Sequence, residues 1–114
     1  MRAFRILLAI LFFTIVIYTL FVVKNHGLGL LPIFFGDIKA MTWPGQFNLD
    51  FLGFLVLSGT WLAWRNHFTP KGIALGVLGF FGGIPVLTTY LFFVSLKAKD
   101  MKEIFLGPKR AAAT

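Results

Sequence analysis

Three long apolar stretches dominate the pattern of hydrophobic and polar positions along the chain. They cover about residues 4–23, 47–64 and 73–96, and polar or basic segments separate them. A helix needs about 20 residues to cross the hydrocarbon core of a bilayer. None of the stretches alternates polar and apolar residues as the strands of a membrane barrel do. Because backbone groups in lipid must be hydrogen-bonded within the segment, the pattern predicts three transmembrane helices.

The segments between these stretches predict the rest of the architecture. The first connection, residues 24–46, is too apolar for a solvated loop, and its run Leu28–Phe35 is too short to span a bilayer. We expect this connection to lie at the membrane interface. The short basic connection 65–71 predicts an antiparallel hairpin of the second and third helices. The tail, residues 97–114, mixes charged and apolar positions and predicts an amphipathic helical extension along the membrane surface.

Composition supports this assignment and excludes a free-standing soluble domain. Of the 114 residues, 58% are hydrophobic and 13% are charged, and the mean hydropathy is +0.85. Soluble domains carry about 25% charged residues. The length allows a single domain, residues 1–114. The sequence has no cysteine, which excludes disulfides, thiolate metal sites and thiol nucleophiles. The predicted fold class is an all-α membrane protein with three transmembrane helices, an interfacial first loop and an amphipathic C-terminal extension.

The net charge of +7 bears on partners and orientation. The basic residues cluster near the predicted helix ends, where anionic lipids rather than nucleic acid are the expected partner. Three spans place four basic residues on the side of the N-terminus and seven on the other side. That count favours a cytoplasmic tail, whereas the first two helices taken singly favour a cytoplasmic N-terminus. We expect a cytoplasmic N-terminus, an opposite tail and a first helix retained as an uncleaved anchor.

Four glycines give the third stretch its clearest pattern. Gly72, Gly76, Gly79 and Gly83 follow one another at intervals of four, three and four residues, which places them on one helical face. Small residues at this spacing allow another backbone to approach closely. Two interpretations remain open. The groove receives another helix of the same chain, or it receives a partner protein or a flat lipid-soluble molecule. A bound lipid, quinone or pigment at a partner interface is compatible with the second interpretation.

A polar cluster of Gln46, Asn48 and Asp50 stands at the start of the second stretch. An ionisable residue inside a membrane span is a functional candidate because its burial is costly unless it is paired. The competing interpretation is structural. Polar side chains in the first turns of a helix satisfy free backbone N–H groups and complement the helix dipole. Lys39 or Lys24 is the expected salt-bridge partner of Asp50.

Aromatic residues fit the predicted spans. Trp43 and Trp61 are 18 positions apart, or about 27 Å along a helix, close to the hydrocarbon thickness. We therefore expect Trp43 at one interface and Trp61, Trp64 and Arg65 at the other, in contact with lipid headgroups. Ordinary interfacial anchoring explains the same residues.

Reactive motifs are missing from the sequence. It has no phosphate-binding glycine loop, no histidine–glutamate metal motif and no serine–histidine–acid set. Three spans would place His26 and His67 at opposite interfaces, so one metal or haem site could not use both. We expect no catalytic residue, no metal and no resident cofactor, and therefore a protein that is not an enzyme.

Two segments carry a family resemblance. The run Trp43–Phe51 and the run Trp61–Arg65 resemble a group of small three-span bacterial inner-membrane proteins of unknown function, and the likeness covers about residues 43–96. The resemblance implies a location in the bacterial inner membrane. It carries over no functional residue, because that group has no assigned activity.

These observations predict a non-enzymatic accessory or assembly subunit. We expect it to pack against a larger integral membrane complex, whether respiratory, photosynthetic or transport. The alternative is a small homo-oligomeric transporter or channel that uses Gln46, Asn48 and Asp50 along its route. Three helices alone enclose little space, so this alternative requires several copies of the chain.

Overall fold

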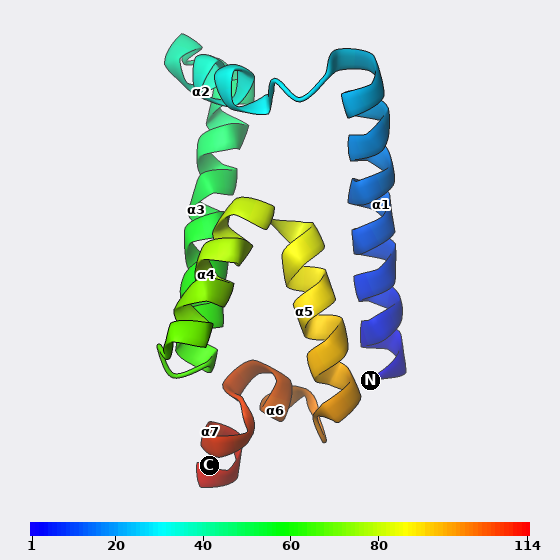
Figure 1. Ribbon diagram of the computed structural model, residues 1–114, viewed down its shortest axis with the longest axis vertical. Coiled ribbons are helices and arrows are strands. Elements are labelled where there is room, and N and C mark those ends of the chain that lie inside the picture. Colours follow the sequence, from blue (N-terminus) through cyan, green and yellow to red (C-terminus); the bar gives the residue numbers. More distant parts are fainter.

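The computed structural model describes all residues 1–114, and the chain consists of helices joined by short turns (Figure 1). The helices are α1 (Arg2–His26), α2 (Leu30–Ala40), α3 (Trp43–Arg65), α4 (Pro70–Gly82), α5 (Ile84–Lys97), α6 (Met101–Leu106) and α7 (Pro108–Ala113). The molecule is elongated, with extents of 48 × 27 × 24 Å. The predicted all-helical architecture is confirmed.

Two helices, α1 and α3, are long and apolar enough to cross a membrane. They have 25 and 23 residues, or about 37 and 34 Å at 1.5 Å per residue. Their most apolar windows are only 6% and 17% buried within the chain, whereas the core helix of a soluble protein is mostly buried. The first two predicted spans thus coincide with helices of spanning length whose apolar surface other parts of the chain leave uncovered.

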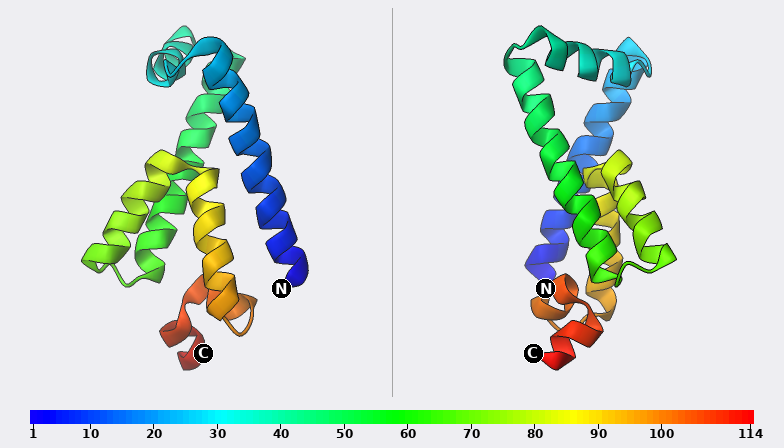
Figure 2. Two further views of the ribbon diagram at one scale, coloured as in Figure 1. Left: turned by 45° about the vertical axis from the view of Figure 1, so that its right-hand side comes forward. Right: turned by 90° about the vertical axis from the view of Figure 1, so that its left-hand side faces the viewer.

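The prediction of a third span over residues 73–96 is wrong. This segment forms two short helices, α4 and α5, which make a hairpin with its tip part-way along α3 and both of its feet at one end of the molecule (Figures 1 and 2). Gly83 reverses the chain with φ 63° and ψ −142°. Pro85 follows in the first turn of α5, where it supplies no N–H and cannot continue α4. Each arm, at 13 or 14 residues, is too short to span.

At the opposite end of the molecule, α2 lies across the top of α3 (Figure 2). Most of the apolar run Leu28–Phe35 is helical, because α2 begins at Leu30. The helices come into backbone contact at Gly45, where an added methyl group would collide with the carbonyl oxygen of Asp37. Asn48 also donates from Nδ2 to the carbonyl oxygen of Phe34 at 3.1 Å. These two contacts fix the angle between α2 and α3.

The tail differs from the predicted extension. The chain is extended at Ala98, and Asp100 begins a new helix by accepting a hydrogen bond from the backbone N–H of Glu103 at 2.9 Å. Gly107, with φ 86°, separates α6 from α7. Because α5 runs back along α4, this tail lies at the same end as the N-terminus (Figure 2). Three spans would have placed it at the opposite end.

The hairpin connects the two long helices. α1 packs on α5 and α3 packs on α4. The core is small, since 13 of 114 residues are buried, and its apolar cluster joins Leu8 of α1, Leu91 of α5 and Ile104 of α6. Beyond the tip of the hairpin, α1 carries exposed apolar side chains from Ile15 to Val22. Packing is therefore concentrated at the end that carries both termini.

This arrangement predicts which turns share a side of a membrane. The sequence contains no cysteine, so single cysteines at Asn25, His67 and Thr114 report separately. In membrane vesicles of one orientation, a membrane-impermeant maleimide should label H67C and T114C from the same side and N25C from the other. A straight third span would instead place T114C with N25C, and that labelling pattern would refute the hairpin.

Candidate functional site

The glycine face of α4 is filled by α3 of the same chain. A methyl group added at Gly76 would lie 2.7 Å from the carbonyl oxygen of Gly59, and one at Gly59 would lie 2.7 Å from that of Gly76. Gly72 and Gly79 are also buried, and a methyl group added at either would meet the side chain of Asn66 or Leu62, respectively. The fourth glycine, Gly83, forms the hairpin tip instead. The geometry matches the first interpretation of the groove, in which it receives another helix of the same chain.

Arg65, expected among lipid headgroups, lies under the tail. Its Nε donates to the carbonyl oxygen of Ile104 at 2.6 Å, and its Nη2 donates to that of Glu103 at 3.3 Å. Its Nη1 donates to the hydroxyl of Tyr90 at 2.9 Å, and Asn66 donates to the same hydroxyl at 2.9 Å. One guanidinium therefore joins the end of α3 to both α5 and α6.

The two neighbouring tryptophans also contact the tail. Arg110 of α7 stacks its guanidinium 3.9 Å from the ring centroid of Trp64 and donates to the carbonyl oxygen of Trp64 at 2.6 Å. Trp61 donates from Nε1 to the carbonyl oxygen of Phe105 at 3.1 Å. Cation–π stacking and hydrogen bonds thus act together here. Trp43, in contrast, lies at the far end of α3 and is exposed.

A third arginine repeats the same chemistry. Arg5 of α1 donates from Nε to the hydroxyl of Ser95 at 3.1 Å and from Nη2 to its carbonyl oxygen at 2.8 Å. Arg5, Arg65 and Arg110 therefore each bind carbonyl oxygens in the last turn of a helix other than their own, namely α5, α6 and α3. The last carbonyls of a helix lack intrahelical partners and carry the negative end of its dipole. Guanidinium groups satisfy both the hydrogen bonds and the charge.

The predicted polar cluster is not brought together. Asn48 faces α2 through its bond to Phe34, whereas Gln46 and Asp50 are exposed on another face of α3. Asp50 pairs with neither Lys39 nor Lys24. It stands two turns into the helix, beyond the first-turn positions at which a side chain caps the backbone.

Gln46 and Asp50 begin a stripe of residues on α3, which we call the outward stripe. Its members are spaced by four, three and four positions and lie on one helical face: Gln46, Asp50, Gly53 and Leu57. At 100° per residue, this face is opposite the one that packs on α4 through Gly59 and Leu62. A methyl group added at Gly53 would meet nothing within 4 Å. The outward stripe therefore presents polar groups and a small residue away from the rest of the chain.

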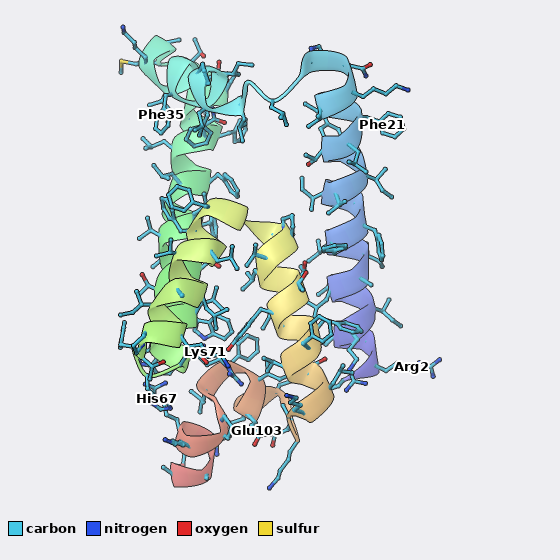
Figure 3. All side chains as sticks on the ribbon, viewed as in Figure 1. Arg2, Phe21, Phe35, His67, Lys71 and Glu103 are labelled. Atoms are coloured by element: carbon cyan, nitrogen blue, oxygen red, sulfur yellow. The ribbon has the colours of Figure 1, made fainter.

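Charge separates along the long axis of the molecule. Nine of the eleven basic residues lie at the end with both termini, which we call the basic end: Arg2, Arg5, Arg65, Lys71, Lys97, Lys99, Lys102, Lys109 and Arg110. The opposite end has two lysines, Lys24 and Lys39, and two acidic residues, Asp37 and Asp50, so its formal charges cancel. The acidic residues at the basic end are Asp100 and Glu103, so the whole formal charge of +7 belongs to it. Figure 3 shows Arg2, Lys71 and Glu103 there, and Phe21 and Phe35 opposite.

The histidines add no metal site. His26 ends α1 and His67 lies in the turn at the basic end, so they are at opposite ends of the molecule (Figure 3). No group of three or more histidine, cysteine or acidic side chains is close enough to hold a metal ion. Local desolvation and the positive charges of Arg110 and Lys109 lower the pKa of His67 from its ordinary value. The neighbouring cations thus favour the neutral form of this imidazole.

The residues that join the helices at this end could not be identified from the sequence. Tyr90, Ser95 and Arg110 carry no motif, and the bond between Arg5 and Ser95 joins positions 90 residues apart.

Comparison of the chain with protein-family models, curated proteins and solved structures gives no match. The resemblance to small bacterial inner-membrane proteins thus stays a prediction.

The close packing at Gly76 and the open space at Gly53 predict different effects of the same glycine-to-alanine substitution. G76A should lower the free energy of unfolding in detergent by about 1–3 kcal/mol, because its methyl group collides with the backbone of α3. G53A should leave it unchanged or raise it by up to about 1 kcal/mol, because alanine favours a helix and meets open space. Reversible SDS titration measures both values. Equal effects of G76A and G53A would contradict the observed packing.

The hydrogen bonds of Arg65 predict that the tail keeps its folded position only while this side chain is present. R65Q removes the guanidinium that binds α6, and charge-assisted hydrogen bonds contribute about 1.5–3 kcal/mol each. Amide hydrogen exchange across residues 101–113 should therefore accelerate about tenfold or more. R2Q is the matched control, because the side chain of Arg2 is exposed and forms no hydrogen bond within the chain. Unchanged exchange in R65Q would show that the tail is held by other contacts.

Proposed function

We propose that this chain is a non-enzymatic accessory or assembly subunit, embedded in a membrane and packed against a larger membrane protein complex through the outward stripe of α3. The observation that carries the proposal is the position of Asp50. Its carboxylate is exposed, has no partner in the chain and lies on an apolar helix of spanning length.

Energetics favour a protein neighbour over lipid at this position. A charged side chain at the centre of a bilayer costs about 2.5–3.5 kcal/mol on insertion scales, and less toward the interface. Hydroxyls elsewhere on the long helices avoid such a cost, because Thr19 and Thr60 each donate to the carbonyl oxygen four residues earlier. Gln46 and Asp50 have no equivalent bond. A partner helix with a basic or hydroxyl side chain would satisfy them, and Gly53 would let its backbone approach closely.

The same proposal includes a location and an orientation. We place α1 and α3 across the bacterial inner membrane, with the α4–α5 hairpin entering from the side of the basic end. Because cytoplasmic segments next to membrane helices are enriched in lysine and arginine, the basic end faces the cytoplasm. Both termini are then cytoplasmic, and the conflict that three spans create between the basic tail and the basic N-terminus disappears.

The outward stripe also supports a second candidate, a small homo-oligomeric transporter or channel. Several copies of α3 arranged around an axis would turn Gln46 and Asp50 toward one another and line a polar route. Asn48 would not take part, because it bonds to Phe34 of α2.

Assembly tests the first proposal. The chain should be extracted gently from its native membrane and separated on native gels, with every co-migrating polypeptide identified by mass spectrometry. G53L should lose most of the co-migrating complex, because a large side chain there prevents close approach of a partner helix. G36L on α2 is the matched control, since Gly36 also has open space around its Cβ position. Migration of the unchanged chain only as a monomer would refute the proposal.

Flux measurements separate the two candidates. If the chain is a transporter, liposomes that contain it alone should show ion or solute flux, and D50N should abolish that flux without altering thermal stability. The accessory-subunit proposal predicts no flux from the chain alone.

A further inference from the structure

The basic end has a second, independent feature, which is that most of its cations have no partner in the chain. Arg5, Arg65 and Arg110 are half-buried and bind carbonyl oxygens of other helices. The other six are exposed and form no side-chain hydrogen bond within the chain: Arg2, Lys71, Lys97, Lys99, Lys102 and Lys109. The three arginines therefore stabilise the fold, while the six remaining cations are available to bind something else.

These cations come from several separate elements and meet at one end. Lys71 is at the foot of α4, Lys97 ends α5, and Lys102 and Lys109 belong to the tail helices. The tail reaches this position because Arg65 and Arg110 tie it to the end of α3. The cationic surface is thus a product of the folded tail, and it is not a run of charge along one segment.

Large apolar side chains lie among the cations. Phe68, Leu96, Met101 and Phe105 are between 37% and 55% exposed at this end. A surface that mixes free lysines with exposed aliphatic and aromatic groups suits the headgroup layer of a bilayer, where the cations meet phosphates and the apolar groups enter the acyl boundary. The two apolar helices of spanning length also reach this end (Figure 1). The observations therefore favour a lipid surface over a nucleic acid.

We infer that the basic end is a binding surface for the phosphate groups of anionic phospholipids in one leaflet, and that the folded tail creates it. This surface is distinct from the outward stripe, and it determines which lipids surround the protein. The opposite end has its charges balanced and so lacks such a preference. Screening by salt should weaken the binding, because the six cations are exposed.

Tryptophan quenching by brominated lipids tests the inference. Trp61 and Trp64 report from the basic end once Trp43 is replaced by phenylalanine, and W43F serves as the parent for all variants. The parent is reconstituted in mixtures of phosphatidylcholine and phosphatidylglycerol. In one mixture the phosphatidylglycerol is brominated, and in the other the phosphatidylcholine is brominated. Relative quenching gives the preference for the anionic lipid. Each cation near an anionic leaflet contributes about 1 kcal/mol, so we expect at least about a tenfold preference at low salt.

Three variants locate the effect. K99Q/K102Q/K109Q should lower the preference to about twofold or less, because these three cations lie on the tail surface. K24Q/K39Q, at the opposite end, should leave it unchanged. R65Q should also reduce the preference even though every lysine remains, because it releases the tail. Helix content and thermal stability in uncharged detergent confirm that each lysine variant is folded.

Each remaining outcome is decisive. Preference that is unchanged in K99Q/K102Q/K109Q, or lost equally in K24Q/K39Q, overturns the inference. So does binding of a single-stranded RNA homopolymer by the detergent-solubilised protein without preference for the anionic lipid. An excess of glycerol phosphate should not displace the lipid; if it does, the surface binds free phosphate and the inference fails. Loss of the outward-stripe assembly with retained lipid preference would refute only the proposed function.

Discussion

The reversal of the backbone between α4 and α5 is the constraint on which the other features of this molecule depend. Gly83 adopts a positive φ of 63° that other residues rarely adopt, and Pro85 prevents the helix from continuing through the turn. In the proposed membrane location, such a reversal requires that its polar backbone groups be satisfied by protein. Here Leu87 donates to the carbonyl oxygen of Gly83, and Thr88 donates to that of Ile84. Phe51 and Leu55 of α3 cover the tip.

The position of the tail follows from this reversal. Because α5 returns to the end from which α4 starts, residues 98–114 emerge beside the N-terminus of α1 and the C-terminus of α3. The carbonyl ends of three helices and the side chains of three arginines then meet. Repulsion among these cations is offset by the helix dipoles and by hydrogen bonds to carbonyl oxygens. Most of the exposed lysines lie at the same end, so the positive charge of the molecule is concentrated there.

Sequence patterns could predict the long helices but not the reversal. α1 and α3 follow from apolar length alone, and the glycine spacing of α4 identifies a face that another helix approaches. The segment 73–96 is apolar on all sides, so its hydropathy is the same whether it runs straight or turns back at Gly83. Only the local pair Gly83 and Pro85 indicates a break, and such pairs also produce simple kinks.

The candidate sites were predictable to different degrees. Asp50 stands out in the sequence as a carboxylate near a span, yet its direction depends on how α3 is rotated against α4, which the contact at Gly59 decides. Arg65 also stands out, but its partners lie 38 and 39 positions away in a tail whose path depends on the reversal. Contacts of this kind require the fold first, and no local spacing encodes them.

One distance tests the reversal most directly. Spin labels at K71C and L96C, measured by double electron–electron resonance in lipid nanodiscs, report the separation between the start of α4 and the end of α5. A hairpin with both feet at one end predicts a distance shorter than the 27 Å width of the molecule. A continuous helix over these 25 steps would separate the labels by about 37 Å, and that result would contradict the account.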